Sequence, residues 1–318
     1  MARYRFSRRR SRDYPLPAQG MRYPELTAAL PRRDIQHAVR GGELLTPGRD
    51  LYIPAPESEA ERHVATLQAL CRGTEHLVSH HTAAALWGMV SREVSAPYHV
   101  TSPAASARIR RPGLVISHRS DVPAADRTML AGLPITTPAR TWIDVALTCP
   151  ELEAVVLADR CRRRGRAEYN EDPRPLADSS ELEAALRRRG RPRGIAQVRR
   201  ALELSRDGVD SPQETRLRLL MRRAGLPEPE VNVWICDEHG QRAVQPDLSI
   251  RQYRVAIQYE GWEYHTAPEQ MARDVRRQER TEALGWTEVR ITRDHMRNGG
   301  AEAVQKIRRA LRQRGWRG

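Results

Sequence analysis

Acidic and amide side chains recur between residues 211 and 292 at spacings that could hold a divalent metal ion. Glu214 opens a predicted helix, Asp247 lies on a predicted strand, and Gln258 and Glu260 lie two residues apart on the strand that follows. Side chains two apart on a strand share one face, so Gln258 and Glu260 project together. Carboxylate and amide oxygens bind hard cations, which polarise phosphoryl oxygens and acidify a bound water. The chemistry that this set could support is metal-assisted attack on a phosphodiester.

Capping residues and periodicity predict the elements that must position these side chains. Ser211 as an N-cap and Pro212 at the first helical position predict a helix that runs to about Arg223, with Glu214 on its inward stripe. The later elements are predicted strands at 231–236, 243–250 and 253–261, a helix at 267–284 and a strand at 286–292. Strand, helix and strand in this order predict a parallel crossover beside an antiparallel hairpin.

The ordered set resembles a known group of nucleases. Glu214, then Pro246-Asp247 and, after ten residues, Gln258-Tyr259-Glu260 are similar to the PD-(D/E)XK superfamily. The strings SPQETRLRLL, AGLP, PDL, VAIQYEGWEYH and LGWTEVRIT resemble the very-short-patch-repair-like endonuclease family, which includes domain-of-unknown-function family 559. The resemblance implies a restriction-endonuclease-like α/β domain with a mixed sheet that hydrolyses DNA phosphodiesters with Mg²⁺, or with Mn²⁺.

The same resemblance assigns roles to individual residues. Asp247, Gln258 and Glu260 would bind the metal, and Glu214 would be an outer or second-metal ligand. His265 would act as a general base or phosphate contact. The side chains that would orient these groups from the next helix are Asp274 and Arg277.

Two positions depart from the family pattern. The family usually has Glu where this chain has Gln258, and the superfamily usually has Lys in place of Glu260. An amide binds Mg²⁺ more weakly than a carboxylate, and no Lys stands there to activate water. The plainer interpretations are a capping role for Glu214, strand-end charges at Asp247 and Glu260, a loop histidine at His265 and a solvated pair of Asp274 with Arg277.

Residues 22–54 carry a second pattern, two short helices followed by a hairpin. Helices are predicted at 23–30 and 31–40, and strands at 44–46 and 51–53. Ile35, Ala38 and Val39 form the inward face of the second helix. This order of elements outlines a winged helix-turn-helix.

The string LTAALPRRDIQHAVRGGELLTPGRDLYIP resembles the N-terminal domain of the abortive-infection, AbiEi-like antitoxin family. That resemblance implies DNA binding and autoregulation of an operon. The side chains that would face the major groove are Arg32, Arg33, Gln36 and Arg40, with Arg49 on the wing near phosphates. The alternative interpretation is a small structural cap with a basic outer face.

Composition limits the classes of protein to consider. A formal net charge of +14, from 54 Lys and Arg against 40 Asp and Glu, suits DNA as a partner. The four Cys form no CxxC pair, so neither a zinc site nor a disulfide framework is predicted. Apolar runs are too short to span a membrane, and the first twenty residues lack a signal peptide's apolar middle. We therefore expect a cytoplasmic protein without a membrane partner.

The whole chain is predicted to be an α+β multidomain protein. The predicted segments are a disordered basic arm at 1–20, the winged helix-turn-helix at 21–55, an α+β middle domain at 56–164, a linker with helices at 165–210 and the endonuclease-like domain at 211–318. In the middle domain, Ser79-His80-His81 is interpreted as a helix cap with packing histidines, because adjacent residues point apart on a helix. The middle domain also resembles, through SHHTAAALWG and GLPITTPARTWID, the central segment of proteins with the same flanking domains.

Two functions from different classes follow. The first is a DNA-binding protein with a Mg²⁺-dependent endonuclease domain. The second is a noncatalytic, AbiEi-like antitoxin or transcriptional repressor whose nuclease-like domain only binds, with a toxin or operon partner. A plainer interpretation is a protein-interaction scaffold.

Overall fold

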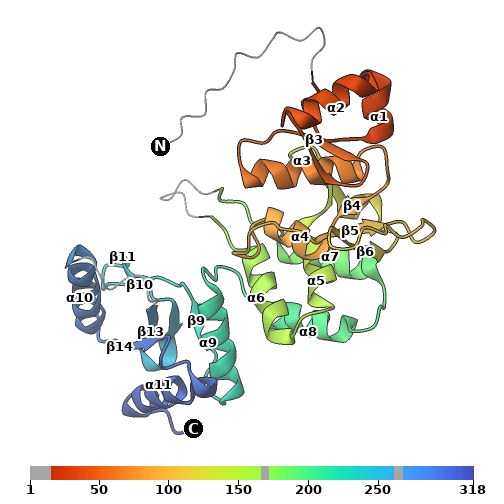
Figure 1. The fold of residues 1–318 in the computed structure, drawn as a ribbon. Coiled ribbons are helices and arrows are strands. Elements are labelled where there is room, and N and C mark those ends of the chain that lie inside the picture. Colours follow the sequence, from red (N-terminus) through yellow and green to blue (C-terminus); the bar gives the residue numbers. More distant parts are fainter. Residues whose placement is uncertain (1–15, 166–171, 261–267) are drawn as a thin grey trace. The chain divides into compact units, whose positions relative to one another are not determined.

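The computed structural model describes residues 16–165, 172–260 and 268–318, with side chains from residue 275 onward in the last range (Figure 1). The chain separates into two compact units, Met1–Thr137 and Pro138–Gly318. Each unit mixes helices with sheets, as predicted for an α+β protein. The finer segment boundaries stay predictions. Over the described ranges, every helix is too short or too polar to cross a membrane.

The first unit begins with a helix pair packed on a small antiparallel sheet. The elements are β1 (Met21–Arg22), α1 (Tyr23–Ala29), α2 (Arg32–Arg40), β2 (Leu44–Gly48) and β3 (Leu51–Pro54), with sheet order β1-β3-β2. Both predicted helices and the hairpin are confirmed, while β1 was not predicted because two residues carry no periodicity. The side chains buried between helices and sheet are Leu26, Leu30, Ile35, Ala38 and Leu44.

The rest of the first unit is a mixed sheet with two helices. Its order is β6-β5-β4-β8-β7, with parallel pairs β5·β6 and β4·β8. The elements are α3 (Glu59–Cys71), β4 (Leu77–Val78), α4 (His80–Leu86), β5 (Tyr98–Ser102), β6 (Val115–Arg119), β7 (Arg127–Leu130) and β8 (Leu133–Thr136). The sequence predicts strands at 98–101 and 114–118, and the structure confirms them as β5 and β6. Strands β4, β7 and β8 were not predicted, since each is too short to show alternation.

The second unit opens with a layer of helices. They are α5 (Pro138–Ala146), α6 (Glu151–Arg162), α7 (Ser179–Arg189), α8 (Ile195–Leu204) and α9 (Pro212–Arg223). One buried carboxylate joins α6 to α9. Asp159 accepts from Arg218 Nη2 at 3.2 Å, from Thr215 Oγ1 at 2.8 Å and from the Arg206 backbone N–H at 2.7 Å. This shared carboxylate holds α6 against α9, and both helices belong to the second unit.

The C-terminal sheet has the order β14-β13-β12-β9, with β13 and β14 parallel and the other pairs antiparallel. Its elements are β9 (Glu230–Val231), β12 (Leu248–Ile250), β13 (Val255–Glu260), α10 (Pro268–Ala283), β14 (Thr287–Thr292) and α11 (Ala301–Gln313). Val255, Ile257 and Tyr259 pack with α9 and α11 on one face. Helix α10 contacts the edge strand β14, beside which Figure 1 draws it. The predicted parallel crossover is confirmed.

Two predicted strands are wrong in extent. The strand expected at 231–236 is divided between β9 and β10 (Ile235–Cys236), which belong to different sheets. The turn between them has Asn232 at φ 49°, a backbone conformation that no strand contains. The strand expected at 243–250 is divided into β11 (Arg242–Val244) and β12. Asp247 therefore lies just before β12 rather than on a strand, after a proline that cannot donate to a ladder.

We expect Arg218→Leu to lower the free energy of unfolding by about 3–5 kcal/mol, because it leaves a buried carboxylate without its cation. Both side chains are at most 2% exposed, and burial already raises the pKa of Asp159. Urea unfolding followed by tryptophan fluorescence measures the change. In the matched control Arg200→Leu, whose partner Glu151 is partly exposed, the loss stays under about 1 kcal/mol. Equal losses in the two variants would contradict the prediction.

Candidate functional site

Helix α2 presents polar and cationic side chains outward while its apolar side is buried. Ile35 is 3% exposed and Ala38 is fully buried, which fixes the rotation of the helix about its axis. The four predicted groove residues, Arg32, Arg33, Gln36 and Arg40, are all exposed. Arg33 lies 3.5 Å from Asp34, with its own side chain 88% exposed. The helix thus holds these four side chains on one solvent-facing surface.

The hairpin after α2 leads to a basic groove that sequence analysis missed. Arg49, at its tip, is 92% exposed. Next to it is a groove of about 780 Å³ whose cationic lining residues are Arg22, Arg49, Arg108, Arg110 and Arg111. Asp50 is the acidic side chain in this lining. The run RIRRPG at 108–113 was the signal that could have found the groove.

The five cations of this basic groove face one acidic lining side chain, Asp50, which lies 3.7 Å from Arg49. Burial, and then the positive charge of Arg22, lowers the pKa of Arg111. Arg22 is held in place because its Nη2 donates to the Leu70 carbonyl at 2.6 Å. Within the described ranges, neither Arg108 nor Arg110 forms an ion pair with a carboxylate. Guanidinium groups that lie close together repel one another, and a bound anion offsets that repulsion. Phosphate groups are anions that Arg binds well, because its forked donors match their oxygens.

The second site lies at the N-terminal end of β12. Because Leu248 pairs with Ile257 in the antiparallel ladder, Asp247 lies next to Gln258. The Tyr259 backbone N–H donates to Asp247 Oδ2 at 2.6 Å. In the orientation that its neighbours favour, the Gln258 amide donates to both Asp247 carboxylate oxygens at 3.2 Å. The structure therefore brings these two predicted ligands together.

Glu214 is close enough to this pair to interact with it electrostatically. Its side chain is 5% exposed and accepts from the Asp210 backbone N–H at 3.1 Å and from Asn232 Nδ2 at 3.0 Å. Burial, and then the negative charge of Asp247, raises the pKa of Glu214 to about 7. Its own backbone N–H donates to the N-cap Ser211 Oγ at 3.2 Å. Glu214 thus has a structural role at the helix start and a charge coupling to Asp247.

Glu260 was predicted to bind a metal ion, and in the structure it pairs with an arginine. It shares a face of β13 with Gln258, but Arg290 Nη1 lies 3.4 Å from its carboxylate. Arg290 also contacts Glu288 at 2.9 Å, and Arg277 lies 3.9 Å from Glu288. In the described part of the chain, no group of three or more His, Cys, Asp or Glu side chains is arranged to hold a metal ion. The predicted His265 and the side chain of Asp274 lie outside the described residues.

We expect the free energy of unfolding to fall by about 3 kcal/mol as pH rises through the range in which Glu214 is protonated in the folded protein and ionised in the unfolded chain. That window runs from the ordinary value of 4.5 to about 7. In this range unfolding releases the proton, so higher pH favours the unfolded chain. In Glu214→Gln this component is absent, as urea unfolding at a series of pH values would measure. The control Glu153→Gln changes a partly exposed carboxylate and should keep the wild-type pH slope; a similar slope in Glu214→Gln would refute the assignment.

The chain is similar to a known domain family over part of its length and to two known proteins over most of it. Residues 76–204 match the family model of the AbiEi antitoxin C-terminal domain. The chain is also similar to the uncharacterized protein Rv2248 of Mycobacterium tuberculosis strain H37Rv and to the uncharacterized protein MT2308 of strain CDC 1551. Both are 29% identical over 283 residues, which cover 89% of this chain and 97% of each relative.

A crystal structure of the RV2827C protein from Mycobacterium tuberculosis aligns with a TM-score of 0.41 and 17% identity, covering 62% of this chain and 74% of that one. Sequence analysis predicted an AbiEi-like relationship from the N-terminal helix pair, but the match falls on the following region, in which it found no chemistry. Residues 76–204 are therefore identified as an AbiEi antitoxin C-terminal domain.

Proposed function

We propose that this protein is a DNA-binding, antitoxin-like repressor whose N-terminal helix pair and hairpin form a winged helix-turn-helix. The observation that carries the proposal is the excess of exposed arginines on α2 and in the basic groove over the carboxylates Asp34 and Asp50 that pair with two of them. In a helix-turn-helix the second helix enters the major groove, so α2 would present Arg32, Arg33, Gln36 and Arg40 to base edges. At the hairpin tip the Arg49 side chain is 92% exposed, so it could reach the DNA backbone.

The two parts of this surface would have different tasks. Gln36 on α2 has the amide donor and acceptor that read adenine in the major groove. Arg49 and the arginines of the basic groove would contact phosphates, which position the protein without reading sequence. Because the guanidinium groups repel one another in the free protein, neutralisation by phosphates releases that repulsion on binding.

The AbiEi antitoxin C-terminal domain at residues 76–204 supports the second half of the proposal, an antitoxin role. Its partner would be a toxin protein encoded in the same operon, and the chain would repress that operon by binding its control region. Co-purification of the full chain with the product of an adjacent gene tests this part. A chain that binds DNA but no such product would be a repressor alone.

We expect the affinity for duplexes selected from a random library to fall linearly with salt on logarithmic axes. Arg49→Ala should reduce that slope by about 0.9, since one phosphate contact is lost. Gln36→Ala should reduce the preference for the selected sequence by about 1–3 kcal/mol and leave the slope unchanged. Fluorescence anisotropy measures both quantities, and EDTA should change neither.

The matched control for these DNA measurements is Arg199→Ala, which removes an exposed arginine from α8. It should alter neither slope nor preference. If Arg49→Ala and Gln36→Ala behave like this control, the DNA surface lies elsewhere and the winged-helix assignment fails.

A second candidate function is Mg²⁺-dependent cleavage of DNA, favoured by one observation: two neighbouring carboxylates beside an amide. Asp247 raises the pKa of Glu214, so the pair is stabilised by a proton or a cation. The Gln258 amide donates to Asp247, but rotated by half a turn it would offer its carbonyl oxygen instead. That orientation is favourable only with a cation between the two oxygens, so these three side chains fit Mg²⁺ as oxygen ligands.

The chemistry that Mg²⁺ would supply when bound is polarisation of a phosphoryl oxygen and acidification of a water. The chain's own residues would do the rest. Arg290, which contacts Glu260, would keep that carboxylate in place and offer a cation to the phosphate. Asn232, which donates to Glu214, would fix the direction of its carboxylate.

We expect wild-type protein to nick supercoiled plasmid when Mg²⁺ or Mn²⁺ is added, and Asp247→Asn to reduce nicking to the level of an EDTA sample. The reason is that Asp247 would be the ligand common to every arrangement of the metal. Agarose gels quantify the nicked fraction. The control Asp294→Asn changes an exposed carboxylate and should cut like wild type. Absence of nicking with either metal, while DNA binding persists, would leave the repressor function as the sole proposal.

A further inference from the structure

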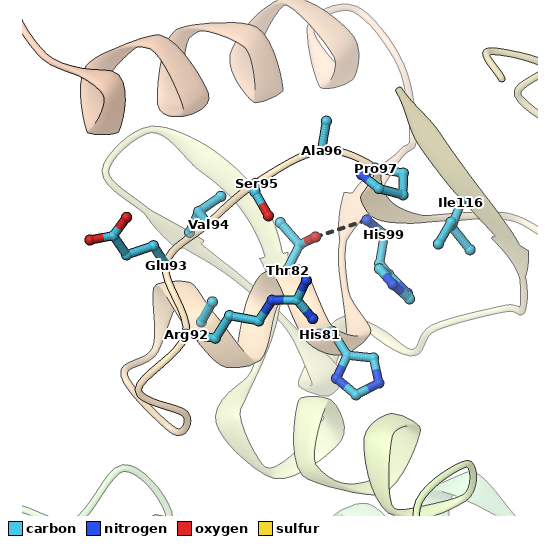
Figure 2. A pocket seen from close by; sticks show the side chains of 11 residues that line it. His81, Thr82, Arg92, Glu93, Val94, Ser95, Ala96, Pro97, His99 and Ile116 are labelled. Carbon is cyan, nitrogen blue, oxygen red and sulfur yellow. Dashed lines mark hydrogen bonds between the residues drawn. The ribbon is translucent and has the colours of Figure 1, made fainter. Parts of the chain in front are cut away.

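The first unit holds a polar pocket that neither proposed function uses. It has a volume of about 250 Å³ and lies between α4, the segment 92–97 and strands β5 and β6 (Figure 2). The polar side chains of its lining include His81, Thr82, Arg92, Ser95 and His99. A pocket of this size accommodates a small charged group with a few further atoms.

The lining is rich in hydrogen-bond donors. In Figure 2 the Arg92 side chain reaches toward Thr82 and His81, while Glu93 points away from them. Thr82 is already engaged, because the His99 backbone N–H donates to its Oγ1 at 2.8 Å. Among the described residues, no carboxylate forms an ion pair with Arg92. The pocket therefore offers a guanidinium and imidazoles to a ligand, and its acidic lining residue, Glu93, points away from them.

Behind the lining, imidazole rings pack against one another. His99 Nδ1 and His118 Nε2 share a hydrogen bond of 3.0 Å. The rings of His118 and His80 stack with centroids 3.5 Å apart and planes 12° apart. The His81 ring meets the His99 ring edge-on, with centroids 5.2 Å apart. A proton gained by His99 or His118 would be shared across their hydrogen bond, and its charge would act on the neighbouring rings of His80 and His81.

The surroundings of this cluster disfavour the charged form of His81, His99 and His118. Burial, and then the neighbouring His118, His81 and Arg92, lowers the pKa of His99 to about 4. Burial and Arg92 also lower the pKa of His81, and burial and His81 lower that of His118. Every charged neighbour that acts on these three rings disfavours a proton. A negative charge in the pocket would reverse that influence.

We propose that this pocket binds a small oxyanion, the phosphate or carboxylate group of a ligand, through Arg92, His81 and His99, with uptake of a proton by the imidazole cluster. Arg92 supplies a permanent charge and a forked donor. The imidazoles supply a donor that becomes charged when the anion arrives, because the anion's field offsets the cost of burial. The proton comes from solvent and resides on the hydrogen-bonded pair His99 and His118. The inference is independent of DNA binding and of metal-dependent cleavage.

The test is isothermal titration calorimetry of the full chain with sodium sulfate, inorganic phosphate and acetate at constant ionic strength. Sulfate does not titrate near neutral pH, so the dependence of its binding heat on the buffer's ionisation enthalpy reports protons taken up by the protein. We expect saturable binding of sulfate at one site, net proton uptake, and affinity that rises as pH falls from about 7.5 to 5.5, toward the ordinary histidine value. Whether phosphate or acetate binds more tightly identifies the ligand's charged group.

Variants separate the pocket from nonspecific anion binding. Arg92→Gln should weaken sulfate binding roughly tenfold, as expected for one charge-assisted hydrogen bond, and His99→Asn should abolish most of the proton uptake. Because Arg92 is exposed, its variant should melt like wild type. The control Arg62→Gln removes an arginine that pairs with Glu59 on α3 and should bind like wild type. Absence of saturable binding, or equal losses in Arg92→Gln and Arg62→Gln, would overturn the proposal.

Discussion

The cost of leaving a charge unpaired in an apolar interior is the constraint on which the structure depends. The chain carries 54 Lys and Arg, and the arginines that are buried in the described part of the chain pair with carboxylates. Arg140 donates to Asp144 at 2.9 Å and Arg218 to Asp159 at 3.2 Å, all four nearly free of solvent exposure. A buried guanidinium without such a partner would cost several kcal/mol. The arginines that exceed the supply of carboxylates therefore remain at the surface, where α2 and the basic groove collect some of them.

Around Glu214 and Asp247 the charge that needs a partner is negative. Here two carboxylates approach each other in a largely buried site, and the folded protein accommodates them by holding a proton near neutral pH. A few residues away, Glu260 avoids the problem because Arg290 neutralises it. The sheet face therefore has two electrostatic regions. The region of Glu260 is neutralised by its ion pair with Arg290. The region of Glu214 and Asp247 is neutralised by a proton, or by a bound cation, and this requirement is what connects it to metal chemistry.

In the middle of the chain, the pairing of distant strands brings together a cluster of histidines that no local sequence pattern predicts. His80 and His81 are adjacent on α4, and adjacent side chains on a helix point apart. They become part of one cluster because β5 and β6 pair in parallel, with Thr101 opposite His118. That register brings His118 beside His99 and beneath His80. The region identified as an AbiEi antitoxin C-terminal domain therefore contains a polar site as well as a scaffold.

Local order was predictable from the sequence by itself. The cap at Ser211 places Glu214 inward, the apolar stripe of α2 sets which arginines face solvent, and alternation puts Gln258 beside Glu260, because each depends only on neighbours within a turn or a strand. Only the tertiary structure decided the partners. Two predicted strands are interrupted, one at Asn232 and one before Asp247, Glu260 pairs with Arg290, and Asp159 joins α6 to α9. These outcomes depend on the register between distant segments and on the desolvation of each charge, and both are set when the chain packs.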